Sequence, residues 1–324
     1  MLGGILSLLS AATFGLNNAA VRRGVLTGSV LQGLVVTVPI GVPIFVVCCA
    51  LLGGLNELFG FSLESTLYLA AAGIVHFAIG RYGNYRGIQS WGGNLAGIVQ
   101  QSSILITLCF AIALLGEYLT PLRIIGIALI FLGPVVMLPG RKRFEQKAAR
   151  ANFVPKYGEG FFFSMLAALC YGTSPILVRA ALENRSLGTS LAGGTISYVA
   201  ATLAIGVVLL NRKQLNHALA TSSVAMRWFA ISGVFVCFSQ VFRYMALAVA
   251  PVTVVAPILQ LQAIFRTVFA WLLNREHETF DIWVLLGIAV SLLGALALSV
   301  STDFVLNLIP LPATLVDIAH WHWP

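Results

Sequence analysis

Ten long apolar runs, separated by shorter polar stretches, dominate the pattern of this chain. Each run is close to the ~20 residues with which an α-helix crosses the hydrocarbon core of a bilayer. Because a backbone inside lipid must satisfy its own hydrogen bonds, we expect each run to form a helix. The pattern therefore predicts an all-α integral membrane protein with about ten transmembrane helices. The predicted spans are Leu2–Val21, Val30–Leu52, Thr66–Ile88, Leu95–Leu115, Leu122–Leu138, Phe161–Leu182, Leu191–Leu210, Trp228–Ala248, Val252–Leu273 and Ile282–Val300.

One long polar stretch, residues 140–160, divides the runs into two sets, and we interpret it as a basic linker. The first set lies in residues 1–139 and the second in residues 161–300, with five predicted spans in each. Residues 301–324 form a C-terminal tail whose prolines interrupt it too often for another span. The first run lacks a basic flank and a small-residue cleavage pattern, so we expect it to be retained and not removed as a signal peptide.

The two halves resemble each other at a nearly constant offset of 157 to 161 positions. Glycines and polar residues keep their order across this offset, which chance similarity between apolar helices does not explain. A unit with an odd number of spans places its second copy upside down in the membrane. We therefore predict two inverted five-helix repeats, an organisation typical of secondary transporters. Matching pairs include Ser7 and Ser164, Gly15 and Gly172, Arg22 and Arg179, Gly73 and Gly233, Gln100 and Gln260, Thr107 and Thr267, and Gly133 and Gly294.

Basic residues are distributed unevenly between the two predicted membrane faces. Fourteen Lys and Arg residues fall on the face that carries the linker, and three fall on the other face. Since cytoplasmic loops carry the excess of Lys and Arg, we predict a multi-pass protein of the plasma or inner membrane, with a cytoplasmic linker and both termini outside. Arg22, Arg81 and Arg86 are among the fourteen, and we expect Arg81 and Arg86 to extend from a helix end toward the headgroups.

Composition supports a membrane location and excludes one class of partner. Charged residues make up 9% of the chain, hydrophobic residues 59%, and the mean hydropathy is +0.93. Soluble domains carry roughly 25% charged residues, so this chain cannot cover a water-facing surface. The net charge of +8 does not indicate nucleic-acid binding, because the basic residues lie mainly between apolar runs. The five cysteines lie inside apolar runs without metal-ligand spacing, and we expect neither a metal nor another cofactor.

Short motifs at corresponding places in the two halves resemble a known family. The turn GEYLT at 116–120 is followed by a glycine-spaced helix, and REHET at 275–279 repeats the arrangement. FGLNNAAVRR and YGTSPILVRA end the first span of each half with a basic residue. These motifs resemble the drug/metabolite transporter superfamily, and within it the EamA-type proteins with two five-helix repeats. The resemblance implies transport by alternating access, with the first four helices of each repeat around a central cavity and the fifth as a buttress.

The chain departs from this family pattern in two places. Arg275 replaces the glycine of the second turn, and neither Ile104 nor Ala263 is the proline that many members carry midway along the fourth helix of each repeat. Pro257 stands earlier in its helix instead.

Acidic residues are absent from the middle of every predicted span; all eleven fall in loops, turns or the tail. Exporters of lipophilic cations use an intramembrane carboxylate as counter-charge, so cationic drugs are not the expected substrates. Arg266 and Arg243, in contrast, lie inside apolar runs, where a charge costs about 2.5–3.5 kcal/mol. A guanidinium with no acid nearby suits a carboxylate or phosphate of the substrate. The alternative is that each arginine extends toward a headgroup.

Uncharged polar residues gather on the helices that the resemblance assigns to the cavity. Gln262 and Arg266 are four residues apart and so share a helix face. The alternative for each residue is a hydrogen bond between helices that only holds the bundle together. His76 is a further candidate, either as a structural residue or as a proton relay. The candidate substrate-binding residues are Arg266, Gln262, Gln260, Arg243, Gln100, Gln101, Asn17, Asn18, Tyr171 and Thr173, with Ser102, Ser103 and Ser174 beside them.

These observations predict a transporter that moves a small polar metabolite, anionic metabolites included, with or without a coupling ion, and leave the oligomeric state open. A channel and a non-transporting scaffold or receptor bundle remain as alternatives. An intramembrane enzyme is the least favoured, since the chain has no acid pair, no His-Glu-x-x-His motif and no Ser/His arrangement within its spans.

Overall fold

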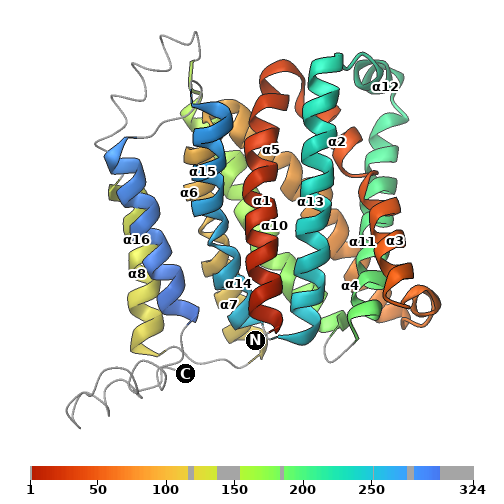
Figure 1. Cartoon of the computed structure of the whole chain (residues 1–324), viewed down its shortest axis with the longest axis horizontal. Coiled ribbons are helices and arrows are strands. Elements are labelled where there is room, and N and C mark those ends of the chain that lie inside the picture. Colours follow the sequence, from red (N-terminus) through yellow and green to blue (C-terminus); the bar gives the residue numbers. More distant parts are fainter. Residues whose placement is uncertain are drawn as a thin grey trace.

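The computed structural model describes residues 2–115, 120–136, 154–182, 186–250, 252–275 and 281–299. Every regular element within these residues is a helix (Figure 1). The first half contains α1 (Leu2–Thr27), α2 (Val30–Thr37), α3 (Gly41–Leu51), the short 3₁₀ helix η1 (Leu55–Phe59), α4 (Leu63–Gly73), the π-helical segment η2 (Ile74–Gly80), α5 (Arg81–Trp91), α6 (Gly93–Gln100), α7 (Ser103–Leu115) and α8 (Pro121–Val136). The second half contains α10 (Tyr157–Leu182), α11 (Leu187–Leu209), α12 (Arg212–Leu219), α13 (Ser223–Val249), α14 (Val252–Leu259), α15 (Gln262–Asn274) and α16 (Ile282–Ser299).

Six helices of the described chain are long and apolar enough to cross a membrane. Four are the single helices α1, α10, α11 and α13, and two are composite rods. One rod joins α2 to α3 over Val30–Leu51, and the other joins α4, η2 and α5 over Leu63–Trp91. The remaining four predicted spans contain α6 with α7, α8, α14 with α15, and α16, which are shorter or interrupted by a turn. The chain is therefore an all-α, multi-pass membrane protein.

Two of these interruptions stand at corresponding places in the two halves. Residues 101–102 separate α6 from α7, and residues 260–261 separate α14 from α15. Each break tightens the backbone into bonds of the i to i+3 type, as between Ser102 N and Val99 O (3.1 Å) and between Leu261 N and Ile258 O (3.1 Å). The sequence predicts an uninterrupted helix at both places, since neither break contains a proline or a glycine.

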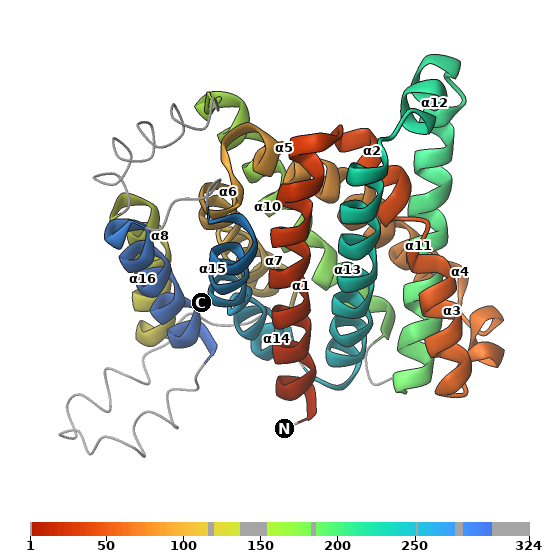
Figure 2. The ribbon, with the colours of Figure 1, turned by 45° about the horizontal axis from the view of Figure 1, so that its top comes forward.

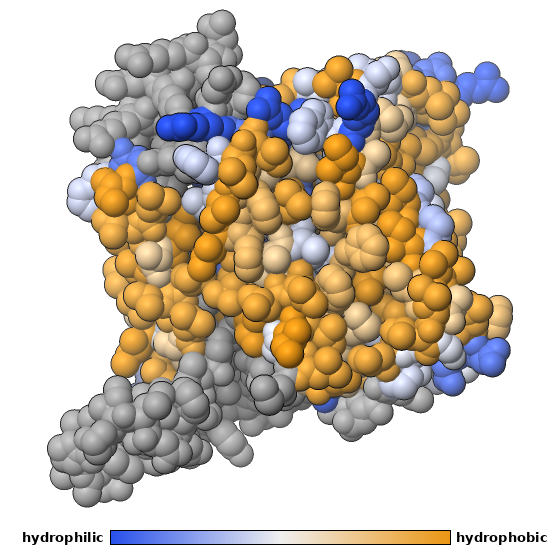
Figure 3. Space-filling model, in the orientation of Figure 1, coloured by the Kyte–Doolittle hydropathy of each residue, from blue (hydrophilic) through white to orange (hydrophobic). Residues whose placement is uncertain are grey.

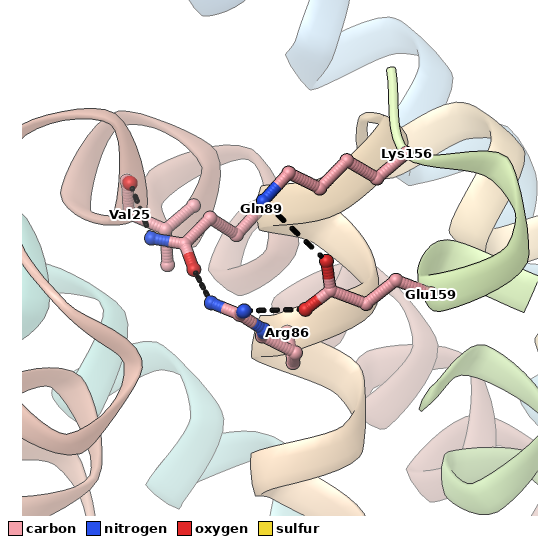
Figure 4. A network of polar contacts seen from close by, with 5 residues as sticks. All are labelled: Val25, Arg86, Gln89, Lys156 and Glu159. Atoms are coloured by element: carbon pink, nitrogen blue, oxygen red, sulfur yellow. Dashed lines mark hydrogen bonds and ion pairs between the residues drawn. The ribbon is translucent and has the colours of Figure 1, made fainter. Parts of the chain in front are cut away.

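The first helices of the two halves run in opposite directions. Gly3, at the start of α1, lies against Ala250 at the end of α13. Arg179, near the end of α10, donates to backbone carbonyls in the last turns of α13, so the end of α10 lies beside the start of α1. At the other face, Val25 of α1 and Glu159 of α10 belong to one polar network (Figure 4).

Helix contacts follow a pattern that is preserved when the halves are exchanged. α1 packs along α13 and α15, and α10 packs along their counterparts α5 and α7. The contacts of α6 with α15 and of α7 with α14 are likewise equivalent. The last helices, α8 and α16, pack against each other at one edge of the bundle, while α1 and α13 lie side by side in its middle (Figure 1, Figure 2).

The outer surface is apolar over most of its height. Hydrophobic side chains cover the middle of the face in Figure 3, and hydrophilic ones gather along its upper edge and at its lower right. Large aliphatic side chains such as Leu203 and Val207 of α11 are 66% and 67% exposed. Apolar exposure on this scale exceeds what a water-soluble monomer presents and fits a lipid-facing surface.

Two arginines that the sequence places at the membrane face are instead inside the bundle. Arg22 is 1% exposed and donates to the Ile88 carbonyl (2.7 Å). Arg81 is 2% exposed and donates to the Thr37 carbonyl (2.9 Å) and the Tyr198 hydroxyl (3.1 Å). The expectation that Arg81 extends to the headgroups is wrong, because residues 63–91 form one continuous rod and its position is mid-rod. Because these two residues were counted on the linker face, the excess of Lys and Arg on that face is smaller by two.

Candidate functional site

A cavity of about 60 Å³ with both polar and apolar side chains in its wall lies between the two halves. This volume accommodates a few water molecules or a small polar group. The first half contributes to its lining from α1, η2 and α7. The second half contributes from α10, α13, α14 and α15. The lining residues are Ser10, Phe14, His76, Ser103, Thr107, Tyr171, Pro175, Ser239, Gln240, Arg243, Ala256, Leu259, Gln260 and Gln262.

Arg243 is the one arginine or lysine among the described residues of this lining. It is 3% exposed, and its Nη1 donates to Ser174 Oγ at 3.2 Å. Its Nε and Nη2 have no hydrogen-bond partner in the described part of the chain, and its Cζ lies 5.5 Å from the centre of the Tyr244 ring. None of the described residues that line it is an Asp or Glu. Within the described part of the chain, the cavity therefore holds a guanidinium with donor capacity to spare and no acidic counter-charge.

His76 reaches the cavity from the π-helical segment η2. Its Nδ1 is 2.7 Å from Ser174 Oγ, the same oxygen to which Arg243 donates. The imidazole ring packs on Tyr171, with 4.4 Å between ring centres. Single π turns inside α-helices rotate the following residues and are frequent at functional sites. Here such a turn places a titratable side chain beside the buried arginine.

The two helix breaks meet at this cavity. Gln260, at the break between α14 and α15, donates from Nε2 to Ser103 Oγ at the start of α7 (3.2 Å). Thr107 of α7 donates to the Gly172 carbonyl of α10 (2.8 Å). Gln262 lines the cavity from the first residue of α15. The broken segments of both halves thus present amide and hydroxyl groups to a single space.

The structure brings four of the ten predicted site residues to the cavity and places six outside its lining. Those at the cavity are Arg243, Gln260, Gln262 and Tyr171. The other six are Arg266, Gln100, Gln101, Asn17, Asn18 and Thr173.

Several of these six belong to a second polar layer, toward the face that carries the start of α10. Gln100 donates to Asn84 Oδ1 (2.8 Å), and Asn84 donates to Asn18 Oδ1 (3.1 Å), so one chain of amides joins α6, α5 and α1. Asn17 accepts a hydrogen bond from Ser232 of α13 (2.7 Å).

Two further candidates outside the cavity are Gln101, which is buried, and Thr173, which forms a hydrogen bond within its own helix. Gln101 is 4% exposed. Thr173 donates to the Leu169 carbonyl, one turn earlier in α10 (2.8 Å).

Arg266 occupies a buried position of its own. It is 3% exposed, and its guanidinium lies over the backbone of Gly97 in α6. A methyl group at Gly97 would come within 1.6 Å of Arg266 Cζ. The absence of a side chain at Gly97 therefore makes room for this guanidinium. Although Gln262 and Arg266 are four residues apart, Gln262 lines the cavity and Arg266 packs one turn beyond it.

Sequence reasoning missed Ser239 and Gln240, which line the cavity beside Arg243 on α13. A signal was present, because residues three and four apart share a helix face and Arg243 follows both at those spacings.

Helices of membrane length around a polar cavity define an α-helical integral membrane protein with an internal site. The model of the EamA-like transporter family matches residues 1–138 and 158–300. The chain therefore belongs to the EamA-like transporter family and is a membrane transporter of the drug/metabolite transporter superfamily, as the sequence motifs predict.

A solved structure titled "Crystal structure of protein" has a similar fold. It is 16% identical to this chain with a TM-score of 0.60, and the match covers 91% of this chain and 94% of the other. At this identity the likeness concerns the fold alone. No curated protein matches the chain.

Proposed function

We propose that this protein carries a small polar anion across the membrane by alternating access. The observation on which the proposal rests is the guanidinium of Arg243 at a cavity to whose lining the described residues contribute no carboxylate. Removing a charge from water is costly unless a partner offsets the lost hydration. Tyr244 and Ser174 offset only part of it, since two of the nitrogens of Arg243 lack a hydrogen-bond partner in the described chain.

The rest of the lining suits an anion of a few atoms. A carboxylate or phosphate accepts two parallel hydrogen bonds from a guanidinium, which adds direction to the charge attraction. The amides of Gln260 and Gln262 and the hydroxyl of Tyr171 supply further donors around the same space. In this proposal Arg243, Gln260, Gln262 and Tyr171 contact the substrate first.

The arrangement of the two halves supports alternating access. α1 and α10 run in opposite directions, and the contacts between helices are preserved when the halves are exchanged. Such a relation is expected of inverted repeats, in which each half adopts the conformation of the other to open the opposite face. The proposal accordingly includes ten spans in two inverted five-helix repeats.

Further polar contacts join the two halves. Arg23 of α1 donates to the Leu273 carbonyl of α15 (2.9 Å from Nε). Asn274 donates in return to the Ala19 carbonyl (2.8 Å). We propose that these contacts open in the other state and that the second polar layer then becomes accessible. In that state Asn17, Asn18, Gln100, Gln101 and Arg266 are the proposed contacts along the path.

Counterflow in proteoliposomes tests the proposal. Vesicles preloaded with an unlabelled anion should take up the labelled anion transiently above equilibrium, a result that a carrier gives and a channel does not. Acetate, lactate, succinate, phosphate and zwitterionic alanine, tested singly, cover carboxylates, a phosphate and a zwitterion. Failure of every anion in the panel would refute the proposed substrate class.

Arg243→Gln should weaken the transport of the preferred anion strongly. A hydrogen bond to a charged group contributes about 1.5–3 kcal/mol, which corresponds to roughly ten- to a hundredfold in affinity. Arg227→Gln is the matched control, because Arg227 lies exposed near the start of the same helix. Equal transport by the two variants would remove Arg243 from the site.

A further inference from the structure

His76 is a buried titratable group that the proposed transport cycle has not yet used. It lies at the cavity and is 6% exposed. Its Nδ1 and the Nη1 of Arg243 meet at one hydroxyl oxygen, that of Ser174, at 2.7 and 3.2 Å. The protonation state of His76 is therefore linked by a single hydroxyl group to the cation that faces the substrate.

The hydroxyl of Ser174 can bridge Arg243 and His76 in two ways. A guanidinium only donates, so Ser174 Oγ accepts from Arg243. The oxygen has a second lone pair and one proton of its own, so toward His76 it either donates to an unprotonated Nδ1 or accepts from Nδ1–H. The same contact therefore fits both the neutral and the protonated imidazole and stays formed while His76 gains or loses a proton.

Positive charge lies on two of the helices around His76. Arg243 of α13 and Arg81 of α5 act on it as positive charges, and Tyr171 of α10 covers its ring. From α11 the facing group is Tyr198, which stacks on the neighbouring Phe77.

The acidic residue of α4 is too distant to offset these charges. Glu64 precedes His76 by twelve residues, about 18 Å along a helix. A second positive charge beside Arg243 and Arg81 therefore needs a negative charge that the described part of the chain does not place there.

We propose that His76 is the proton-binding site of a proton–anion symport, a step that rests on the proposed anion transport. The anion bound at Arg243 supplies the missing negative charge. Nδ1 of His76 then takes a proton from a hydronium ion, so an N–H bond forms as an O–H bond breaks and neutral water remains. Ser174 turns from donor to acceptor toward His76, because Nδ1–H now donates to its oxygen. On the other side the anion leaves, the two positive charges repel, and the proton returns to water. One proton and one anion cross together, and the N–H bond that forms on one side breaks on the other, so the cycle makes no net change in covalent bonds.

Proton movement in proteoliposomes tests this step directly. Vesicles contain a pH-sensitive dye, and the probe is the anion of the panel that shows the strongest counterflow. An inward proton gradient should drive accumulation of a monovalent anion by roughly tenfold per pH unit, since each unit is equivalent to 1.36 kcal/mol. Wild-type vesicles should acidify inside when the anion is added outside. His76→Gln should keep counterflow, which needs no net proton movement, and lose both the accumulation and the acidification.

The control is His217→Gln, because His217 lies in α12 and contacts Ser29, away from the cavity. It should behave as wild type. A second variant, Ser174→Ala, keeps His76 and removes the hydroxyl link. It should shift the pH dependence of accumulation, and it serves as the test if His76→Gln does not fold.

The outcomes separate the two proposals. Counterflow by wild type without proton entry overturns the symport and leaves anion transport intact. Gradient-driven accumulation by His76→Gln also overturns it. Absence of counterflow for every anion refutes the proposed function, and the symport with it.

Discussion

At the scale of single residues, the contact between Arg266 and Gly97 shows how tightly a charge is held in this bundle. The guanidinium lies where the first side-chain carbon of any other residue would be. Arg266 is also buried, so it has little free space into which to move. A charge in such a position stabilises the fold only while its surroundings are intact, because a buried cation that loses partners is strongly destabilising.

Gly97→Ala should therefore lower the melting temperature of the purified protein. Overpacking of a dense interior costs about 1–3 kcal/mol. In a Gly97→Ala/Arg266→Ala double variant the clash is absent, so the effects of the two substitutions should not add. Gly4→Ala is the control, since a methyl group there meets only Ile258 at an ordinary 3.7 Å. Strictly additive losses in the double variant would contradict the proposed contact.

The site residues show what residue-scale sequence reasoning can and cannot predict. The pattern identified a polar layer with Arg243 in it, because a charge within an apolar run is visible in the sequence alone. It did not separate Gln262 from Arg266, since helical spacing gives a shared face but not where the cavity ends along that face. One turn raises a residue by about 5.4 Å, enough to move it from the lining into the packing between helices.

At the scale of elements, the helix breaks matter most for the cavity. The sequence pattern predicts continuous spans there because apolar residues flank both breaks and neither break contains a proline, although Pro257 stands three residues before the second. What the sequence does show at each break is a cluster of polar residues. These are Gln100 to Ser103 in the first half and Gln260 with Gln262 in the second. A polar cluster within an apolar run indicates that the backbone there faces a cavity, where irregular structure can find partners.

The contact between α4 and α11 leads to a prediction about helix packing. Ser197 of α11 donates to the Leu69 carbonyl (2.6 Å), and its own carbonyl lies against Gly73. A methyl group at Gly73 would lie 2.0 Å from that oxygen. Since both partners are backbone, Gly73→Ala must separate the helices, and we expect a loss of about 1–3 kcal/mol.

Thermal unfolding in detergent measures this loss. Gly206→Ala is the matched control on α11, because no atom lies within 4 Å of a methyl group there. Alanine is a better helix former than glycine, so the control should be neutral or slightly stabilising. A melting temperature for Gly73→Ala equal to that of the control would show that the helices do not need this close approach.

At the scale of the whole molecule, hydropathy predicts that the protein lies in the membrane because lipid imposes long apolar helices on any chain that crosses it. Short turn motifs were sufficient to identify the family. The distribution of charge between the faces was less reliable, because Arg22 and Arg81 are buried charges that a count along the sequence cannot distinguish from loop residues. The cytoplasmic position of the linker remains a prediction.

A network on the linker face joins the two halves of the molecule (Figure 4). Arg86 of α5 forms an ion pair with Glu159 of α10, and Lys156 lies 3.8 Å from the same carboxylate. Arg86 also donates to Gln89 (2.7 Å), which donates to the Val25 carbonyl of α1 (3.2 Å). Opening this face by moving one half against the other must break the ion pair, so the pair favours the conformation described here.

Reversing one charge of this pair should therefore open the linker face more often. A partly exposed pair contributes about 0.2–1 kcal/mol, so Arg86→Glu should raise the population of the open state by roughly 1.4- to fivefold. The reporter is Ala20→Cys, a position on α1 that is 1% exposed, in a background without native cysteines. An impermeant maleimide applied to the linker face should label this cysteine faster in Arg86→Glu than in the parent. The exchange Arg86→Glu/Glu159→Arg restores opposite charges and should return labelling to the parent rate. Unchanged labelling in Arg86→Glu, or no recovery on exchange, would mean that the ion pair does not hold this face closed.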